Sequence, residues 1–292
     1  MLLMRLGLRG AERPFVRVGP DRHIDVGDVI ADFGEGFFAA GGPALLTDVV
    51  AQRHEAAEPL DGRRVGAPIA RPHQLLCIGL NYRDHAVEAG MPIPDEPIVF
   101  TKAPNTLVGP DDDVHIPRGS VKTDWEVELG IVIGRRCRYL ADEDAARDAI
   151  AGYVMVNDVS EREFQLERGG QWVKGKSAAT FNPCGPVLVT PDELGDVGDL
   201  AMWLDVNGQR RQDGSTATML FGPAFLVHYL SQFMVLEPGD LINTGTPPGV
   251  GMGADPPTYL RAGDVMELGI AGLGSQRQRV IDAPVDELTD VR

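Results

Sequence analysis

The sequence of 292 residues has few of the features that define several other protein classes. Its three cysteines, Cys77, Cys137 and Cys184, are far apart and form no Cys-x-x-Cys pair, so neither a disulfide framework nor a thiolate zinc site is expected. No apolar run approaches the ~18 residues that a membrane-spanning helix needs. The first ten residues lack the features of a signal peptide. A cytoplasmic location is therefore expected.

Positive charge is also scarce. Lys and Arg number 27 against 43 Asp and Glu, which gives a net charge of −16. This balance disfavours nucleic acid and anionic membrane surfaces as partners, because both need a basic face. It does not disfavour a small anionic substrate, since a bound metal and a few local cations can outweigh the overall field.

Three familiar motifs are absent or incomplete. No Gly-x-Ser-x-Gly elbow occurs, so a serine hydrolase would have no obvious nucleophile. The glycines of 249–253 follow two prolines and stand in no βαβ pattern, which excludes a dinucleotide fingerprint. The acids of 111–113 are consecutive, unlike those of an EF-hand loop.

The distribution of turn residues predicts two domains. Residues 1–66 show weak strand signals and a short helical stretch near 44–51, and are predicted to form a small N-terminal domain. A Pro-, Gly- and Ala-rich stretch over 56–72 predicts a linker. Residues 70–292 are predicted to form the larger domain, which is rich in strands and glycine turns.

Two local elements are predicted in this larger domain. Asn207-Gly208 predicts a type I′ hairpin turn, because both residues accept positive φ angles. One helix is predicted over 223–235, with His228 at its surface. The predicted apolar stripe of that helix consists of Phe225, Leu226, Tyr229, Leu230 and Phe233.

A pair of glutamates opens the most apolar segment of the chain. Glu126 and Glu128 stand two residues apart in Thr123-Asp-Trp-Glu-Val-Glu-Leu-Gly-Ile-Val-Ile-Gly134, which is typical of a buried strand. Side chains at i and i+2 of a strand share a face. Two carboxylates beside an apolar interior would be costly without a cation, and hard divalent cations prefer carboxylate oxygen. Two solvated glutamates on a half-exposed strand are the alternative.

A third carboxylate follows the next strand-like run. Asp158 comes directly after Gly152–Asn157, where it could be a further metal ligand. If a helix begins there, Arg162 and Gln165 at i+4 and i+7 share a face with Asp158. The alternatives are a helix-capping role for Asp158 and a solvated helix face for the other two.

An imidazole and a carboxylate are paired earlier in the chain. His85 and Glu88 are spaced i, i+3, so they would touch on a helix. A carboxylate beside an imidazole raises its basicity, which suits a general base, whereas a weak surface ion pair is the alternative. The stretch 91–97 follows directly and could act as a lid hinge or be an ordinary loop.

With these residues the chain resembles the fumarylacetoacetate hydrolase family, over roughly residues 70–282. Five motifs in the same order carry the resemblance: Gly79-Leu-Asn-Tyr-Arg-Asp-His85, Asp124-Trp-Glu-Val-Glu128, Asn157-Asp-Val-Ser-Glu-Arg162, Gly175-Lys-Ser177 and Thr244-Gly-Thr-Pro-Pro-Gly-Val-Gly251. The family implies a β-rich α+β fold of the mixed β-roll type, a magnesium or manganese site and a homodimer.

The resemblance also implies a role for each candidate residue. By position, Glu126, Glu128 and Asp158 correspond to the metal ligands. Fumarylacetoacetate hydrolase itself has a fourth acidic ligand from its N-terminal side, and this chain has no clear counterpart. The other implied roles are activation of water by His85 and Glu88, stabilisation of the oxyanion by Arg162, Gln165 and Lys176, and contacts to the substrate by Thr246, Tyr82 and Arg83.

Lys176 is expected to enter the site from a loop or strand edge after the flexible Gly169-Gly170, with a surface lysine as the alternative. The expected activity is hydrolysis of the C3–C4 bond of a 2,4-diketo acid to pyruvate or a related 2-oxo acid. Along its length the chain is most similar to the bacterial branch that cleaves 2,4-diketo-3-deoxy sugar acids such as those from rhamnose or fucose. Oxaloacetate decarboxylase, a hydratase, isomerase or lyase, and a non-catalytic metal-binding module are the alternatives.

Overall fold

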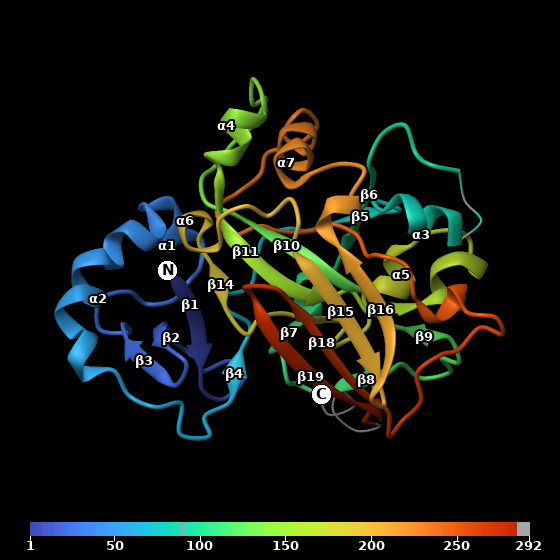
Figure 1. The fold of residues 1–292 in the computed structure, drawn as a ribbon, viewed down its shortest axis with the longest axis horizontal. Helices are drawn as coiled ribbons and strands as arrows, with labels where there is room; N and C mark the ends of the chain where they lie inside the picture. The colour runs from blue at the N-terminus through green and yellow to red at the C-terminus, as the bar shows by residue number, and fades with distance from the viewer. Residues whose placement is uncertain (89, 91, 285–292) are drawn as a thin grey trace, which may run out of the picture.

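A ten-stranded mixed sheet is the largest element of the structure, a computed structural model that describes residues 1–88, 90 and 92–284 (Figure 1). Its β17 and β5 pair in parallel, and its other neighbouring strands are antiparallel. In spatial order the strands are β3 (Arg22–Asp25), β2 (Arg13–Gly19), β1 (Leu2–Leu6), β14 (Leu188–Val189), β11 (Ile150–Asn157), β10 (Val127–Ile133), β17 (Leu241–Asn243), β5 (Leu75–Gly79) and β6 (Ile98–Lys102), and β4 (Val65–Gly66) pairs with β1.

A five-stranded sheet packs against the middle of the large one. Its strands in order are β16 (Gln209–Ser215), β15 (Ala201–Val206), β18 (Val265–Ile270), β19 (Gly274–Asp282) and β8 (Val114–Ile116). Two small ribbons, β12 (Ser160–Glu161) with β9 (Thr123–Asp124) and β13 (Asn182–Pro183) with β7 (Leu107–Val108), complete the strand set of the described residues. The sheets stay open, and the predicted β-rich α+β fold is confirmed.

Alternation along β10 divides the interior into two cores. Leu129 and Ile131 join a cluster between the two sheets that includes Leu268 of β18. Val132 belongs to the second cluster, on the other face of the large sheet, together with Phe33 near the N-terminus. Side chains of opposite parity on one strand therefore reach different cores, as the period of two requires.

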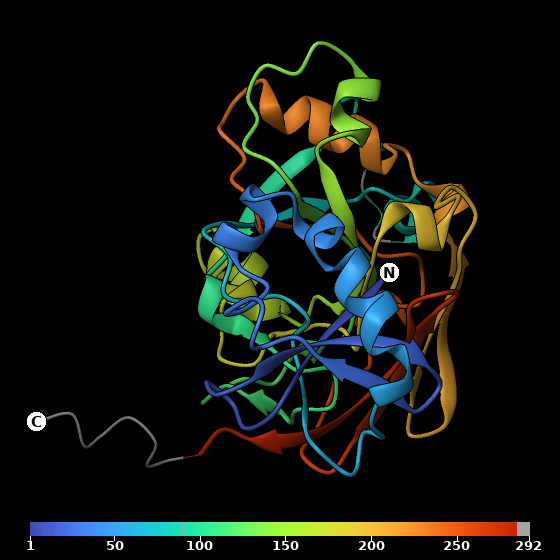
Figure 2. The same ribbon diagram turned by 90° about the vertical axis from the view of Figure 1, so that its left-hand side faces the viewer.

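The N-terminal strands extend the large sheet, because β1 pairs with β14 through Leu2 and Val189. Figure 2 shows these strands and the N-terminal helices from the side. The division of the chain into residues 1–66 and 70–292 stays a prediction. The helical stretch expected near 44–51 is confirmed by a 3₁₀ turn over Gly42–Leu46 and by α2.

The helices are short and lie around the sheets (Figure 1). They are α1 (Glu35–Ala39), α2 (Thr47–Arg53), α3 (Arg83–Glu88), α4 (Glu143–Arg147), α5 (Val173–Lys176), α6 (Pro191–Leu194), α7 (Pro223–Ser231) and the π-helical turn η4 (Glu163–Glu167). None in the described part of the chain is long and apolar enough to cross a membrane. The Asn207-Gly208 turn has φ angles of 53° and 73°, which confirms the predicted hairpin.

The predicted stripe of α7 is only partly correct. Leu226 and Leu230 are buried, but Phe233 is exposed because the helix ends at Ser231. Phe225 and Tyr229 are half-buried and their rings stack along one side of the helix. His228, which was predicted at the surface, is half-buried on this helix, and α4 packs against α7.

Candidate metal centre and active site

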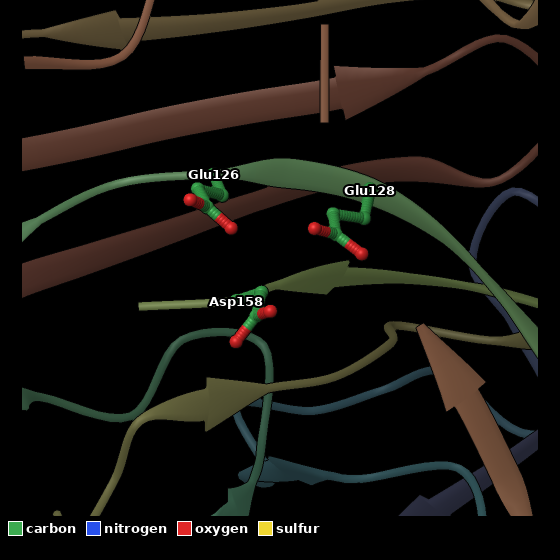
Figure 3. Close-up of side chains that lie close together, drawn as sticks. All are labelled: Glu126, Glu128 and Asp158. Carbon is green, nitrogen blue, oxygen red and sulfur yellow. The ribbon is translucent and has the colours of Figure 1, made fainter. Parts of the chain in front are cut away.

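Three carboxylates meet where β10 begins and β11 ends. Glu126 directly precedes β10 and Glu128 is its second residue, so both lie on the face opposite Leu129. Asp158 directly follows β11 and has the parity of Val156, which pairs with Glu128. One oxygen from each carboxylate lies within 4.8 Å of the others. Figure 3 shows the three side chains close together. The structure therefore brings together all three predicted metal ligands.

This acidic triad (Glu126, Glu128 and Asp158) is almost fully buried, with exposed fractions of 5%, 1% and 0%. The triad does not consist of solvated glutamates, and its charge must be compensated within the protein. Lys176 Nζ lies 2.8 Å from Glu126 Oε2 and 2.9 Å from Asp158 Oδ2, and Arg162 Nη2 lies 2.7 Å from Glu126 Oε1. Burial would raise the pKa of Glu126, but Lys176 and Arg162 outweigh it and lower this pKa to about 2.

Glu128 is the member of the triad for which the described residues provide no cation. Its carboxylate accepts a 2.7 Å hydrogen bond from the Gly245 amide. Burial, and then the charges of Asp158 and Glu126, raise the pKa of Glu128 well above its usual range. A divalent cation would therefore compete with a proton at Glu128.

A second buried lysine, Lys102, which was not predicted from the sequence, contacts Asp158 of the triad. The ammonium group of Lys102 at the end of β6 donates to a carboxylate oxygen of Asp158 and to the carbonyl oxygens of Val159 and Phe181. Its side chain is fully buried. Lys102 therefore fixes one oxygen of Asp158, and the other oxygen faces Lys176 and the rest of the triad.

Replacing Lys102 by methionine is expected to destabilise the protein by about 3–5 kcal/mol, because it leaves a buried carboxylate without its partner. Urea-induced unfolding measures the change. Lys122→Met is the matched control, since its ion pair with Glu167 is largely exposed and is worth at most about 1 kcal/mol. Equal stability of the two variants would show that Lys102 does not stabilise Asp158.

Asp124, the first residue of the acidic motif, was also missed as a site residue. Its carboxylate accepts hydrogen bonds from Arg162 Nε at 2.8 Å and from the amides of Gly251 and Met252 at 2.6 and 3.0 Å. A Cβ atom at position 251 would lie 2.7 Å from this carboxylate, so only glycine allows the approach. Asp124 thus connects Arg162 to the glycine-rich segment 249–253.

The predicted His85–Glu88 pair is formed on α3. His85 Nδ1 and Glu88 Oε2 are 3.1 Å apart, and the imidazole lines the same cavity as Glu126 and Glu128. Glu88 Oε1 accepts a 2.9 Å hydrogen bond from the Gly249 amide. Both oxygens of Glu88 are therefore engaged, one by His85 and one by the Gly249 amide. Of the predicted lid hinge 91–97, Met91 lies outside the described residues, and 92–97 form an irregular segment.

Arg162, Gln165 and Lys176 all line this cavity, but not through the elements predicted for them. No helix begins at Asp158, because the chain first forms β12 and then the π-helical turn η4. Arg162 Nη1 nevertheless donates to Gln165 Oε1 at 3.2 Å. Lys176 enters from α5, not from a loop or strand edge, and Gly175 lets α5 contact the backbone of η4.

The three predicted substrate contacts are placed differently. Thr246 lines the cavity, but its hydroxyl donates to the Val127 carbonyl and accepts from Gln212. Tyr82 is fully buried in the core, with its hydroxyl 3.3 Å from Met202 Sδ. Arg83 is exposed, and neither it nor Tyr82 lines the cavity. Both are close to His85 in the sequence, but Arg83 is two residues before it on α3 and Tyr82 precedes the helix, so their side chains point away from the imidazole.

The cavity has a volume of about 180 Å³ and two chemically distinct parts. The polar part consists of Glu126 and Glu128 of the triad, Thr246, His85 and the three oxyanion candidates. The apolar part is formed by Ile78, Leu80, Phe100, Leu166, Trp172 and Met252. A small substrate would therefore place its charged end on the triad and a less polar end against the aromatic wall.

Two comparisons with known proteins, a family profile and a search for relatives, bear on the family resemblance. The profile of the fumarylacetoacetate (FAA) hydrolase C-terminal family matches residues 74–281. A Burkholderia cenocepacia (strain HI2424) protein named "Putative hydrolase" is 51% identical over 292 residues, which cover 97% of this chain and 100% of that protein.

Two solved structures cover 97% of this chain and 100% of their own. One is fumarylacetoacetate hydrolase from Exiguobacterium antarcticum, with a TM-score of 0.77 and 34% identity. The other is maleylpyruvate hydrolase from Sphingobium sp. SYK-6 in complex with manganese(II) and pyruvate, with a TM-score of 0.80 and 25% identity. The chain belongs to the fumarylacetoacetate hydrolase family.

Proposed function

We propose that the chain is a divalent-metal-dependent hydrolase that cleaves the C3–C4 bond of a 2,4-diketo acid into a 2-oxo acid and a carboxylic acid. The observation that carries the proposal is that Glu126 and Glu128 of the buried triad line one cavity together with His85, which Glu88 contacts from outside that lining. Hydrolysis needs both a charged anchor for the 2-oxo acid and a base for water. The maleylpyruvate hydrolase structure, which contains manganese(II) and pyruvate, supports this reading.

The charges of the site fit a divalent cation. The triad and Asp124 carry four carboxylates, and Lys102, Lys176 and Arg162 provide three positive charges. The all-oxygen donor set suits Mg²⁺ or Mn²⁺. Glu126, Glu128 and Asp158 would hold the ion, which when bound supplies Lewis-acid polarisation of the substrate's 2-oxo acid end.

The protein's own groups provide the remaining steps. Glu88 orients His85, which takes a proton from water while the water oxygen bonds to C4. Lys176 has three N–H donors and uses two on Glu126 and Asp158, so one remains for the oxygen on C4. The C3–C4 bond then breaks, its electron pair stays on C3, and C3 takes up a proton to give the 2-oxo acid.

Isomerisation is the second candidate, because 5-carboxymethyl-2-hydroxymuconate delta-isomerase from Mycobacterium smegmatis shares the fold, with a TM-score of 0.76 and 30% identity. Isomerisation needs proton transfer without addition of water.

Two other functions need fewer groups. A non-catalytic metal module would need only the triad, so the His85–Glu88 pair argues against it. Decarboxylation of oxaloacetate would need the anchor but no base for water.

A substrate screen distinguishes these reactions. Acylpyruvates, 2,4-diketo-3-deoxy sugar acids, unsaturated 2-oxo dicarboxylates and oxaloacetate would be incubated with Mg²⁺ or Mn²⁺, and pyruvate or lactate, carboxylic acid, carbon dioxide and isomers quantified. Hydrolysis predicts equal amounts of 2-oxo acid and carboxylic acid. Isomers or carbon dioxide in their place would contradict the proposal. The resemblance along the length of the chain favours the sugar acids of rhamnose or fucose among these substrates, whereas the lining of the cavity favours a different acyl group, as argued below.

Assembly and location are part of the same proposal. The family resemblance favours a homodimer, which analytical ultracentrifugation would test. A cytoplasmic location is supported by the three cysteines, which are buried and free in the structure.

The effect of a cation on stability is expected to grow with pH. Because folding raises the pKa of Glu128 in the ion-free site, its contribution to stability is present below the unfolded pKa and lost as pH rises through the folded pKa. A bound cation displaces this proton, so its affinity should rise about tenfold per pH unit below the Glu128 pKa. Thermal unfolding with and without Mg²⁺ measures the effect. A pH-independent shift would contradict it.

Replacing Lys176 by methionine is expected to lower kcat and kcat/KM together by about 10²–10³-fold, the typical loss of one oxyanion donor. Its metal affinity should stay equal or rise, because the ammonium group beside Glu126 and Asp158 opposes a cation. Steady-state kinetics and metal titration measure the two effects. Lys174→Met is the control, since Lys174 is exposed on the same helix. Wild-type kcat would exclude the oxyanion role.

A further inference from the structure

The apolar part of the cavity begins directly beside the polar site. Lys176 Nζ, which contacts the triad, also lies 5.1 Å from the centre of the Phe100 ring. The Phe100 ring in turn meets Trp172 edge to face, with centroids 5.1 Å apart. Phe100 and Trp172, with Leu166, form what we call the apolar wall. It starts beside Lys176 at the triad and continues through Phe100 to Trp172.

This wall is held in place by the backbone behind it. A Cβ atom at Gly79 would lie 2.6 Å from the Trp172 ring, so the indole rests directly on the end of β5. Phe100 faces the cavity from β6, opposite Cys77 of β5. Leu166 of η4, next to Gln165, also lines the cavity and is 43% exposed.

The wall provides few partners for polar groups. Among the described lining residues, Arg162 and Lys176 are paired with carboxylates of the site, and these two residues, Gln165 and His85 all belong to the polar part and not to the wall. The one lining hydroxyl group there, that of Thr246, is bonded to Val127 and Gln212. A second carboxylate or a row of sugar hydroxyl groups would lose water without gaining hydrogen bonds, which is costly.

We infer that the acyl group beyond C4 of the substrate is an apolar, unbranched chain that lies on Phe100 and Trp172, and not a polyhydroxylated or carboxylate-bearing group. The inference rests on the proposed function, because the triad must hold the 2-oxo acid end for C4 to face this wall. A cavity of about 180 Å³ is smaller than the ~300 Å³ at which pockets for drug-sized ligands begin. It therefore suits a short chain.

A homologous substrate series tests the inference. With Mg²⁺, kcat/KM is expected to rise about fourfold per methylene group from acetylpyruvate through butanoylpyruvate to the length that fills the cavity. Fumarylpyruvate and 2,4-diketo-3-deoxyrhamnonate are expected to be at least about tenfold poorer than butanoylpyruvate. If these substrates are cleaved but a polar acyl group is preferred, the inference is wrong and the proposed hydrolysis stands.

A matched pair of variants tests the position of the wall. Leu166→Arg would place a cation on it, and is expected to raise the ratio of kcat/KM for fumarylpyruvate over butanoylpyruvate about fivefold. Val173→Arg is the control, because Val173 is 40% exposed on the neighbouring α5 but does not line the cavity. Equal ratios in both variants would show that the acyl group does not reach Leu166.

A binding experiment separates this inference from the proposed function. Calorimetric titration with Mg²⁺ compares 2-oxobutanoate, 2-oxohexanoate and 2-oxoglutarate, none of which can be hydrolysed. Affinity is expected to be higher for 2-oxohexanoate than for either of the others. If no acylpyruvate is cleaved but this order holds, the hydrolase proposal fails and the apolar wall is retained. If 2-oxoglutarate binds best, the inference is overturned.

Discussion

Replacing Glu128 by glutamine is expected to lower kcat/KM about a thousandfold while leaving the ion-free protein as stable as before, or more stable. Glu128 receives a hydrogen bond from the Gly245 amide, which a glutamine oxygen can also accept. Burial, and then the charges of Asp158 and Glu126, raise the pKa of Glu128, so the fold disfavours a negative charge there when no cation is bound. The substitution removes a charge that a bound cation needs and that the metal-free fold disfavours. Loss of Lewis-acid stabilisation worth about 4 kcal/mol corresponds to the expected factor.

Kinetics at saturating Mg²⁺ and thermal unfolding without metal measure the two effects separately. Glu267→Gln is the control, because Glu267 lies on β18 and pairs with Arg277 outside the cavity. A Glu128→Gln variant with more than about a tenth of wild-type kcat/KM would show that this carboxylate is not needed to bind the cation.

The triad could be predicted from the sequence because strand periodicity is a local property. The spacing of Glu126 and Glu128 fixes their common face once the segment is a strand. Asp158 was predicted because it ends the next apolar run, and antiparallel pairing of β10 with β11 brings it to Glu128. These three residues could be predicted from the two-residue period of strands and from their order along the chain alone.

Lys102 and Asp124 were missed although similar signals exist. Lys102 has the parity of Phe100 in β6, which places it on the inward face, but a lysine at a strand end is usually solvated. Asp124 has the parity of Glu126 and Glu128, yet its role depends on amides of residues 251 and 252 that lie far along the chain. Contacts of this range follow from the fold and not from spacing.

Tyr82 and α7 are cases in which the sequence suggested a position that the structure does not show. Tyr82 belongs to a family motif, but the structure uses its ring in the core beside Met202. The stripe of α7 was assigned from apolarity alone, and this criterion cannot separate Phe233 at the exposed end from Leu230 in the core. Which apolar side chain is buried depends on the partner surface, here α4 and the sheet, and not on periodicity.

The pair of catalytic candidates on α3 is expected to separate two reactions. His85→Ala and Glu88→Ala should each lower hydrolysis of the best acylpyruvate by about 10²–10⁴-fold, the usual contribution of a general base. Decarboxylation of oxaloacetate should fall much less, because it needs the 2-oxo acid anchor but no activated water. Both reactions would be followed with the same enzyme preparation and metal concentration, with pyruvate as the common product.

A third variant tests the geometry without altering either side chain of the pair. A Cβ atom at Gly253 would lie 2.5 Å from Glu88 Cδ, so Gly253→Ala must push the carboxylate from its place beside His85. It is expected to reproduce the selective loss of hydrolysis seen in Glu88→Ala. Gly36→Ala is the control, since an added methyl group there meets nothing within 4 Å. If both reactions fall equally in all three variants, His85 and Glu88 position the substrate and do not activate water.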